Sequence, residues 1–288
     1  MHKTLIGKQN YLFLQNDACR ELEVHCNNLN LVKNKDLNYY NFNNFFITVF
    51  PNKSFVYKHF LPDNYNAQYR PALDIYKKKF NNKIMDAYEF IKDEPDVYYQ
   101  TDTHINFKGN YIVYCNFIDK INDMYDLNLI KREIQVLCKS CVLKELPYGI
   151  GDLTWETNLG DQSLNDINDT FYYSNDIVNL YQTHKITNDN ITFFLNYTLQ
   201  DKTTELIEQN RTVDWDIISN HIIYRKNINI DKKYKYLIFY DSFLLSILPL
   251  YLELFYEVYM VKSVYDAAII ERIKPDYVFE FRVERFLL

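Results

Sequence analysis

Glycine and proline are scarce in this chain, and long apolar runs are missing. Only 5 glycines and 7 prolines occur among 288 residues, and no Gly/Ser/Pro-rich linker divides them. We therefore expect a single domain over residues 1–288. The most apolar segment, residues 239–259, is interrupted by charged residues and a proline, so no run reaches the roughly 20 apolar residues of a membrane span.

Other classes are disfavoured on similar grounds. The N-terminus has no apolar stretch of signal-peptide length, which predicts a cytoplasmic protein. A net charge of -6 argues against nucleic acid as a partner. Five cysteines, an odd number, do not predict a disulfide framework in a chain of this length. Cys138 and Cys141 have the spacing of half a zinc site, but no second Cys or His pair accompanies them, so we expect no bound metal.

The region around Ser242 has the pattern of a strand followed by a helix. Residues 234–240 are rich in aromatic and β-branched side chains and predict a buried strand, whereas residues 243–256 predict a helix. The alternation continues with strands at 257–261 and 277–282 and a helix at 265–273. This order predicts a parallel sheet, and ligands bind at the carboxyl ends of such strands.

The first half of the chain predicts the same architecture. The expected elements are strands at 45–50 and 97–100 and helices at 86–92 and 109–125. Residues 131–229 are the least regular part, with strand-like pieces at 134–146 and 191–197 between turns rich in Asn and Asp. We expect this part to be an insertion that shapes the substrate cleft.

Ser242, His104 and Asp102 together supply the groups of an acyl-transfer site. A serine hydroxyl is a weak nucleophile unless a base removes its proton, and that base works best when a third group fixes its tautomer. We expect Ser242 to be the nucleophile, His104 the base and Asp102 the orienting carboxylate. Taken singly, Asp241 and Ser242 could merely cap a helix, and His104 could be a partly buried loop histidine.

Because glycine is used so sparingly, each one is a candidate for a position where no side chain fits. The five are Gly7, Gly109, Gly149, Gly151 and Gly160. They would mark a positive φ or a close approach of backbone. For Gly7 and Gly160, an ordinary turn is at least as good an interpretation.

Six short motifs are spread over most of the chain. They are residues 7–14, residues 49–62, Thr101-Asp102-Thr103-His104 with Gly109, Gly149-Ile150-Gly151-Asp152-Leu153, Asp241-Ser242-Phe243, and residues 274–285. In this order they resemble the alginate O-acetyltransferase branch of the SGNH (GDSL-like) hydrolase superfamily. The resemblance implies a three-layer α/β/α domain with a central, mainly parallel sheet. One departure is Tyr240, which stands where the family usually has a small residue, often glycine.

The resemblance also implies a function. Members of that branch typically move acetyl groups onto polysaccharide hydroxyls, so the expected protein is an O-acetyltransferase with a glycan or polysaccharide substrate. It also implies that Ser242 is the nucleophile, His104 the base and Asp102 the orienting carboxylate, the same roles that their side-chain chemistry predicts. An acetyl donor would be needed, either acetyl-CoA or an acetylated carrier such as a donor protein, and no bound cofactor.

The remaining expectations concern the substrate and the alternatives. Trp155, just after the Gly-Asp-Leu motif, is the expected aromatic platform for a sugar. Gly151 and Asn158 are candidate oxyanion donors by location only. Water in place of the sugar would make the protein a carbohydrate acetyl-esterase. A third alternative is a catalytically inactive glycan-binding or scaffold protein, with Tyr240 blocking the turn at the nucleophile.

Overall fold

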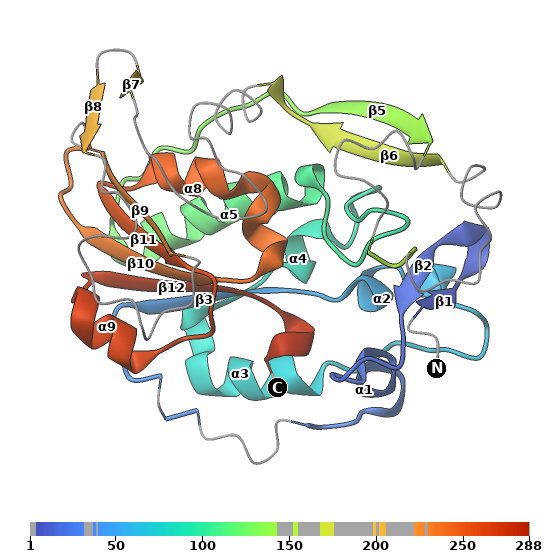
Figure 1. The fold of residues 1–288 in the computed structure, drawn as a ribbon. Coiled ribbons are helices and arrows are strands. Elements are labelled where there is room, and N and C mark those ends of the chain that lie inside the picture. Colours follow the sequence, from blue (N-terminus) through green and yellow to red (C-terminus); the bar gives the residue numbers. More distant parts are fainter. Residues whose placement is uncertain are drawn as a thin grey trace.

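A single large sheet with helices on both sides dominates the computed structural model (Figure 1). The structure describes residues 4–31, 37–38, 40–142, 152–154, 168–175, 198–199, 202–205, 222–227 and 230–287. Within them the predicted α/β class with a mainly parallel sheet is confirmed. No helix in this part of the chain is long and apolar enough to cross a bilayer.

The central strands follow the order predicted around Ser242. The strands are β3 (Phe45–Phe50), β4 (Ile84–Asp86), β7 (Thr198–Leu199), β8 (Lys202–Glu205), β9 (Ile222–Asn227), β10 (Lys235–Tyr240), β11 (Glu257–Val261) and β12 (Tyr277–Val283). Across the described residues the sheet runs β4-β3-β12-β10-β11-β9-β8-β7. The strands from β4 to β11 are parallel, whereas β9, β8 and β7 pair antiparallel. Strands β7, β8 and β9, which lie in the segment 131–229 that was expected to be an insertion, therefore extend the main sheet.

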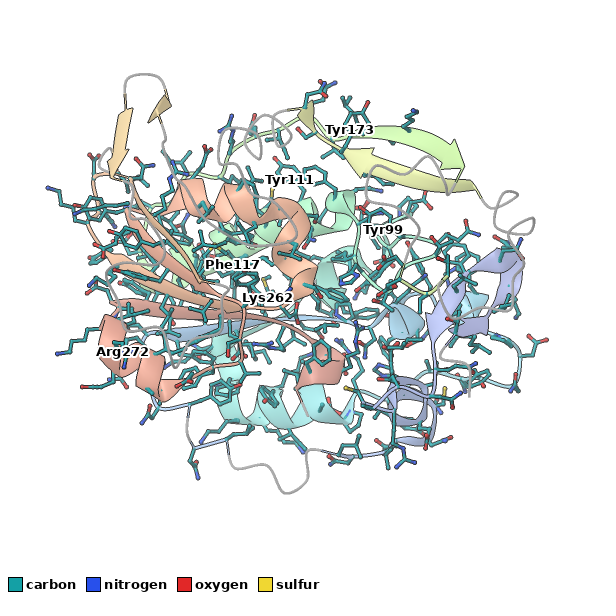
Figure 2. All side chains as sticks on the ribbon, in the orientation of Figure 1. Tyr99, Tyr111, Phe117, Tyr173, Lys262 and Arg272 are labelled. Atoms are coloured by element: carbon teal, nitrogen blue, oxygen red, sulfur yellow. The ribbon has the colours of Figure 1, made fainter. Side chains whose placement is uncertain are left out.

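Helices pack against both faces of this sheet (Figure 1). One face carries α5 (Phe107–Tyr125) and α8 (Leu248–Leu254), and the other carries α3 (Pro71–Phe80) and α9 (Ala267–Ile273). Phe117 of α5 is fully buried on the first face, whereas Arg272 of α9 lies at the outside of the molecule (Figure 2). Two apolar cores result, one on each face, because alternate residues of a strand point to opposite sides.

Smaller elements surround the end of the sheet where the site lies. They are the hairpin β1 (Thr4–Ile6) and β2 (Leu12–Leu14), the helices α1 (Glu21–Asn27), α2 (Lys53–Val56) and α4 (Tyr88–Ile91), and the ribbon β5 (Leu137–Val142) and β6 (Asn168–Tyr173). The 3-10 helices are η1 (Lys8–Asn10), η2 (Lys58–Phe60), η3 (Asn81–Lys83), η6 (Ser242–Ile247) and η7 (Glu284–Phe286).

Two local predictions are wrong. Residues 97–100 form no strand but make one isolated bridge, between Tyr98 and Ile105. The helix predicted from residue 243 starts as the 3-10 helix η6 and becomes an α-helix only at Leu248. Pro249 explains the break, because proline lacks the N–H that a continuous α-helix needs but suits a helix's first turn.

Two of the glycines stand where backbone approaches closely. A Cβ at Gly7 would lie 2.3 Å from the Phe60 carbonyl oxygen, and one at Gly109 would lie 2.7 Å from the Val97 carbonyl oxygen. Both distances are too short for a side chain, so the expectation of close approach is confirmed at these positions. Gly149, Gly151 and Gly160 lie outside the described residues.

Candidate active site

Ser242 is the first residue of η6, and only Asp241 separates it from the carboxyl end of β10. The turn is made by Asp241, whose carboxylate accepts hydrogen bonds from the Phe243 N–H (2.9 Å) and the Val283 N–H (2.7 Å). Asp241 therefore caps η6 and also ties it to the end of β12. The capping role belongs to Asp241, which leaves the hydroxyl of Ser242 free for another partner.

That partner is His104, which lies 138 positions earlier in the chain. Ser242 Oγ is 2.8 Å from His104 Nε2, and Asp102 Oδ1 is 2.5 Å from His104 Nδ1. A carboxylate only accepts hydrogen bonds, so Nδ1 carries the proton and Nε2 accepts from the serine hydroxyl. The structure thus brings Ser242, His104 and Asp102 together in the expected order. The distance between Ser242 Oγ and His104 Nε2 is within the range that a nucleophile and its base require.

Asp102 is held in its ionised form by three donors. Its carboxylate accepts from His104 Nδ1–H, from the His104 N–H (2.8 Å) and from the Asp152 N–H (3.0 Å). Burial alone would raise the pKa of Asp102, but the hydrogen bonds and charge of His104 outweigh it and keep that pKa well below its usual value. Burial likewise would lower the pKa of His104, but the bond to Asp102 raises it overall. The pair favours an imidazolium beside a carboxylate.

Helix α5 positions both the His104 loop and the Ser242 turn. Asn106 caps α5 by accepting from the Gly109 N–H (3.0 Å), which fixes the loop that carries His104. Asn110, one turn further along α5, donates to the Phe243 carbonyl (2.6 Å) and to Ser246 Oγ (2.7 Å). A single helix therefore anchors the histidine loop at its start and η6 along its side.

Tyr240 does not keep Ser242 from its base. Its side chain is fully buried and belongs to the apolar core on the α5 side of the sheet. Ser242 remains partly exposed and in hydrogen-bond contact with His104. In this chain the core accommodates the large residue, so the blocking of the turn that the inactive alternative requires does not occur at these atoms.

One residue at the site was not assigned a role from the sequence. Asp152, in the Gly-Asp-Leu motif, has Oδ2 3.7 Å from His104 Nδ1 and binds the loop between Asp102 and His104. Its motif was the only available signal, because nothing in sequence spacing places residue 152 beside residue 104. Trp155, Gly151 and Asn158, the substrate and oxyanion candidates, lie outside the described residues.

The same groups are those that could hold a metal ion. Among the described residues, Asp102, His104 and Asp152 offer ligand atoms within 4.8 Å of one another. A metal ion on His104 Nδ1 would replace the proton that Asp102 accepts, since one nitrogen cannot serve both. A metal ion at this nitrogen and the hydrogen bond from Nδ1–H to Asp102 therefore exclude one another.

Comparisons with known proteins bear on the fold. No protein-family model and no curated protein matches the sequence. The structure is similar to PatB1 from Bacillus cereus, at 15% identity and a TM-score of 0.58, over 100% of this chain and 97% of that chain. It is similar to a DHHW family protein from Eubacterium siraeum, at 14% identity and a TM-score of 0.54, over 99% and 94%. It is also similar to the O-acetyltransferase domain of AlgJ from Pseudomonas putida, at 12% identity and a TM-score of 0.55, over 100% and 92%. This chain therefore has a fold that is also found in an O-acetyltransferase domain.

Proposed function

We propose that this protein is an O-acetyltransferase that moves an acetyl group onto a glycan hydroxyl through a serine acyl-enzyme. The observation that carries the proposal is the 2.8 Å contact between Ser242 Oγ and His104 Nε2, with Asp102 at the other ring nitrogen. The structural similarity to the AlgJ O-acetyltransferase domain supports an acetyl group as the group that is transferred. The glycan acceptor rests on the motif resemblance.

In the first half-reaction His104 takes the proton of Ser242 as the oxygen attacks the acetyl carbonyl of the donor. The proton then passes from Nε2 to the leaving group as the tetrahedral intermediate collapses. Asp102 stays ionised and stabilises the imidazolium in between, as its lowered pKa favours. The donor would be acetyl-CoA or an acetylated carrier, and the acetyl group ends as an ester on Ser242.

The second half-reaction runs the same steps with a new nucleophile. His104 removes a proton from the acceptor hydroxyl, the acceptor oxygen attacks the acetyl ester, and Ser242 regains its proton. A sugar hydroxyl gives transfer, whereas water gives hydrolysis. Transferase and esterase share this triad and differ in which nucleophile the cleft admits.

The nucleophile can be tested without knowing the donor. A structure of PatB1 carries a sulfonyl adduct, and phenylmethanesulfonyl fluoride reacts with an activated serine by forming an O–S bond with loss of fluoride. We expect one sulfonyl group per chain, located on Ser242 by peptide mass spectrometry, and none in Ser242→Ala. Ser246→Ala, which changes a serine four residues on, should still be labelled. Unlabelled or randomly labelled wild-type protein would contradict an activated Ser242.

The reaction itself is tested with an activated acetyl ester and an oligosaccharide. We expect slow acetate release that falls by roughly 10³-fold or more in both Ser242→Ala and His104→Ala, since the members of a catalytic unit are not additive. Added acceptor should divert acetyl groups from acetate to the sugar, seen as one added acetyl mass. Removal of acetyl groups from an acetylated glycan without any transfer would favour an esterase. Equal turnover in wild type and Ser242→Ala would favour the inactive scaffold.

A further inference from the structure

A second carboxylate faces the imidazole from the side opposite to Ser242. Asp152 Oδ2 lies 3.7 Å from His104 Nδ1, just beyond the 2.5 Å contact made by Asp102 Oδ1. The Asp152 side chain is 42% exposed, so its charge is partly screened by water. His104 therefore meets two acidic groups at one nitrogen and the serine at the other.

Asp152 and the histidine loop hold one another by hydrogen bonds in both directions. The Asp152 N–H donates to Asp102 Oδ2 (3.0 Å). In return, the Thr103 N–H donates to Asp152 Oδ1 (2.7 Å) and Thr103 Oγ1 donates to Asp152 Oδ2 (2.6 Å). Both Asp152 oxygens are thereby oriented, and the second oxygen of Asp102 is fixed by a backbone donor. A carboxylate that is merely exposed to solvent is not usually held by hydrogen bonds at both of its oxygens.

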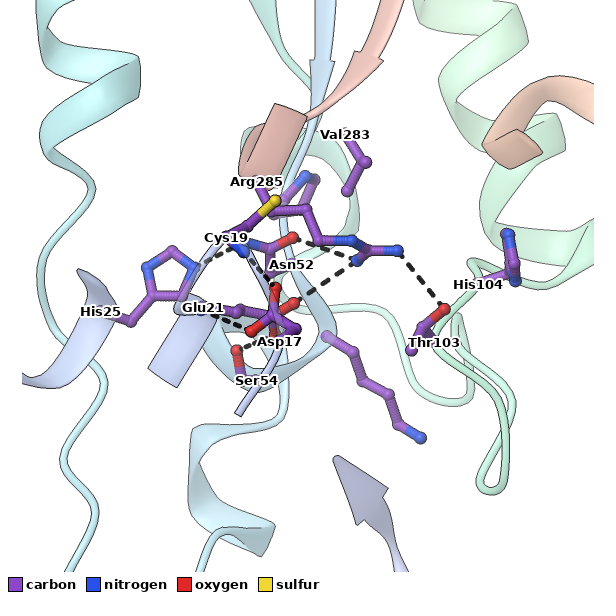
Figure 3. A network of polar contacts seen from close by, with 12 residues as sticks. Asp17, Cys19, Glu21, His25, Asn52, Ser54, Thr103, His104, Val283 and Arg285 are labelled. Atoms are coloured by element: carbon purple, nitrogen blue, oxygen red, sulfur yellow. Dashed lines mark hydrogen bonds and ion pairs between the residues drawn. The ribbon is translucent and has the colours of Figure 1, made fainter. Parts of the chain in front are cut away.

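Buried residues support the hydrogen bonds between Asp152 and the histidine loop. Thr103 is buried, and its Oγ1 accepts from Arg285 Nη2 (3.4 Å), while Arg285 Nη1 contacts Glu21 Oε2 and Asn52 Oδ1 at 3.4 Å each (Figure 3). On the other side, the Leu153 N–H donates to the Thr101 carbonyl (3.3 Å). The position of Asp152 is thus set by a chain of contacts that begins in the core.

We propose that Asp152 is a positioning residue of this site, which orients Asp102 and adds negative charge that stabilises protonated His104. The role rests on the proposed function, because only a proton-transferring histidine needs such support. The charged groups that face His104 are Asp102, Asp152 and Arg285, and the ring of Phe243 lies 5.1 Å from the imidazole. The positive charge of Arg285 lowers the pKa of His104, and the negative charge of Asp152 raises it, so the second carboxylate offsets part of the effect of Arg285.

The test measures the His104 pKa directly, by NMR titration of its ring signals, in wild type and Asp152→Asn. Asparagine keeps the shape and can still accept from the Thr103 N–H, but it removes the charge. We expect the pKa to fall by roughly one unit and the acidic limb of kcat/KM against pH to move down equally. Asp126→Asn is the matched control: Asp126 follows the last residue of α5 at φ 50, a conformation that asparagine tolerates, and it lies about 28 Å along the helix axis from Phe107, the first residue of α5.

The Thr103 variants separate charge from architecture. Thr103→Val removes the hydroxyl that holds Asp152 but no charge, so the pKa should fall by less, and Thr103→Ser should restore it. An unchanged His104 pKa in folded Asp152→Asn would overturn the proposal, whatever happens to turnover. The NMR titration reads the coupling even in protein without measurable activity, so failure of the acetyltransferase assignment would be seen separately.

Discussion

The buried ammonium of Lys53 donates a 3.0 Å hydrogen bond to the backbone carbonyl of Asp102. The same nitrogen donates to the carbonyls of Leu12 (2.7 Å) and Gln100 (2.8 Å), one N–H for each acceptor. Lys53 is 3% exposed, and it joins the N-terminal hairpin to the loop that carries Asp102. A lysine that is remote in sequence thus fixes the backbone at Asp102, two residues before His104.

Lys53→Met should therefore destabilise the protein and weaken the site. The side chain is similar in length, but three carbonyls each lose a hydrogen bond from a buried ammonium, and we expect the free energy of unfolding to fall by roughly 3 kcal/mol. Urea unfolding measures the loss, and acetate release should fall as the Asp102 loop loosens. Lys58→Met, at an exposed position nearby, should change stability by less than about 0.5 kcal/mol. Equal effects of the two variants would rule out the anchoring role.

The pH dependence of activity should show the raised pKa of His104. The base must be neutral to accept the Ser242 proton, so kcat/KM should rise along a limb centred above pH 6.5, the ordinary histidine value. Asp102→Asn should move this limb to lower pH and reduce the plateau by roughly 10³–10⁴-fold, since the tautomer is no longer held. A pH–rate profile of each protein gives both quantities. An unmoved limb in Asp102→Asn would mean that another group titrates.

The same pair should make stability depend on pH in a defined direction. The lowered pKa of Asp102 contributes stability above its unfolded value of 3.8, and this is lost as pH falls through the folded pKa. The raised pKa of His104 contributes stability that is complete below 6.5 and is lost as pH rises through the folded pKa. Urea unfolding of wild type and His104→Ala should thus differ more at about pH 5 than at about pH 9. A difference that grows with pH would contradict this sign.

Gly109→Ala should destabilise the protein although alanine favours helices. Alanine gains about 1 kcal/mol in helix propensity, but its Cβ would lie 2.7 Å from both the Val97 carbonyl oxygen and Ile105 Cγ1. Overpacking against backbone costs roughly 1–3 kcal/mol, and relief would shift Ile105, the neighbour of His104. Thermal unfolding and acetate release should both decline. Lys120→Ala, on the exposed side of the same helix, should leave both nearly unchanged, and a stabilised Gly109→Ala would disprove the close contact.

Tyr240 offers a test of the opposite sign. Its hydroxyl is buried and has no hydrogen-bond partner among the described residues, so Tyr240→Phe removes an unsatisfied group without a cavity. We expect stability to stay equal or rise by about 1 kcal/mol, with unchanged acetate release. Tyr240→Ala should lose roughly 3–5 kcal/mol through the cavity left in the core. A clear loss in Tyr240→Phe would reveal a partner for the hydroxyl.

The local sequence pattern was enough to predict the strand and the turn before Ser242, but not that the helix after it begins as a 3-10 helix. Alternation of apolar strands and helices specifies a parallel sheet, and Asp241 next to Ser242 marks its turn, because these features depend on neighbours in the chain. Glycine scarcity likewise pointed to Gly109. The pairing of Ser242 with His104 could not be predicted from neighbouring residues. It followed from the chemistry, because a serine nucleophile needs a base to remove its proton.

Only the tertiary structure decided what surrounds Ser242, His104 and Asp102. Asp152 reaches His104 through bonds to Asp102 and Thr103, and Lys53 reaches Asp102 through its carbonyl. Strand β9 pairs antiparallel with β11, and the sequence pattern does not predict this pairing. Tyr240 turns out to fill the core rather than the site. Each of these depends on which distant segments pack together, and packing is a property of the whole fold, whereas helix and strand patterns are read from adjacent residues.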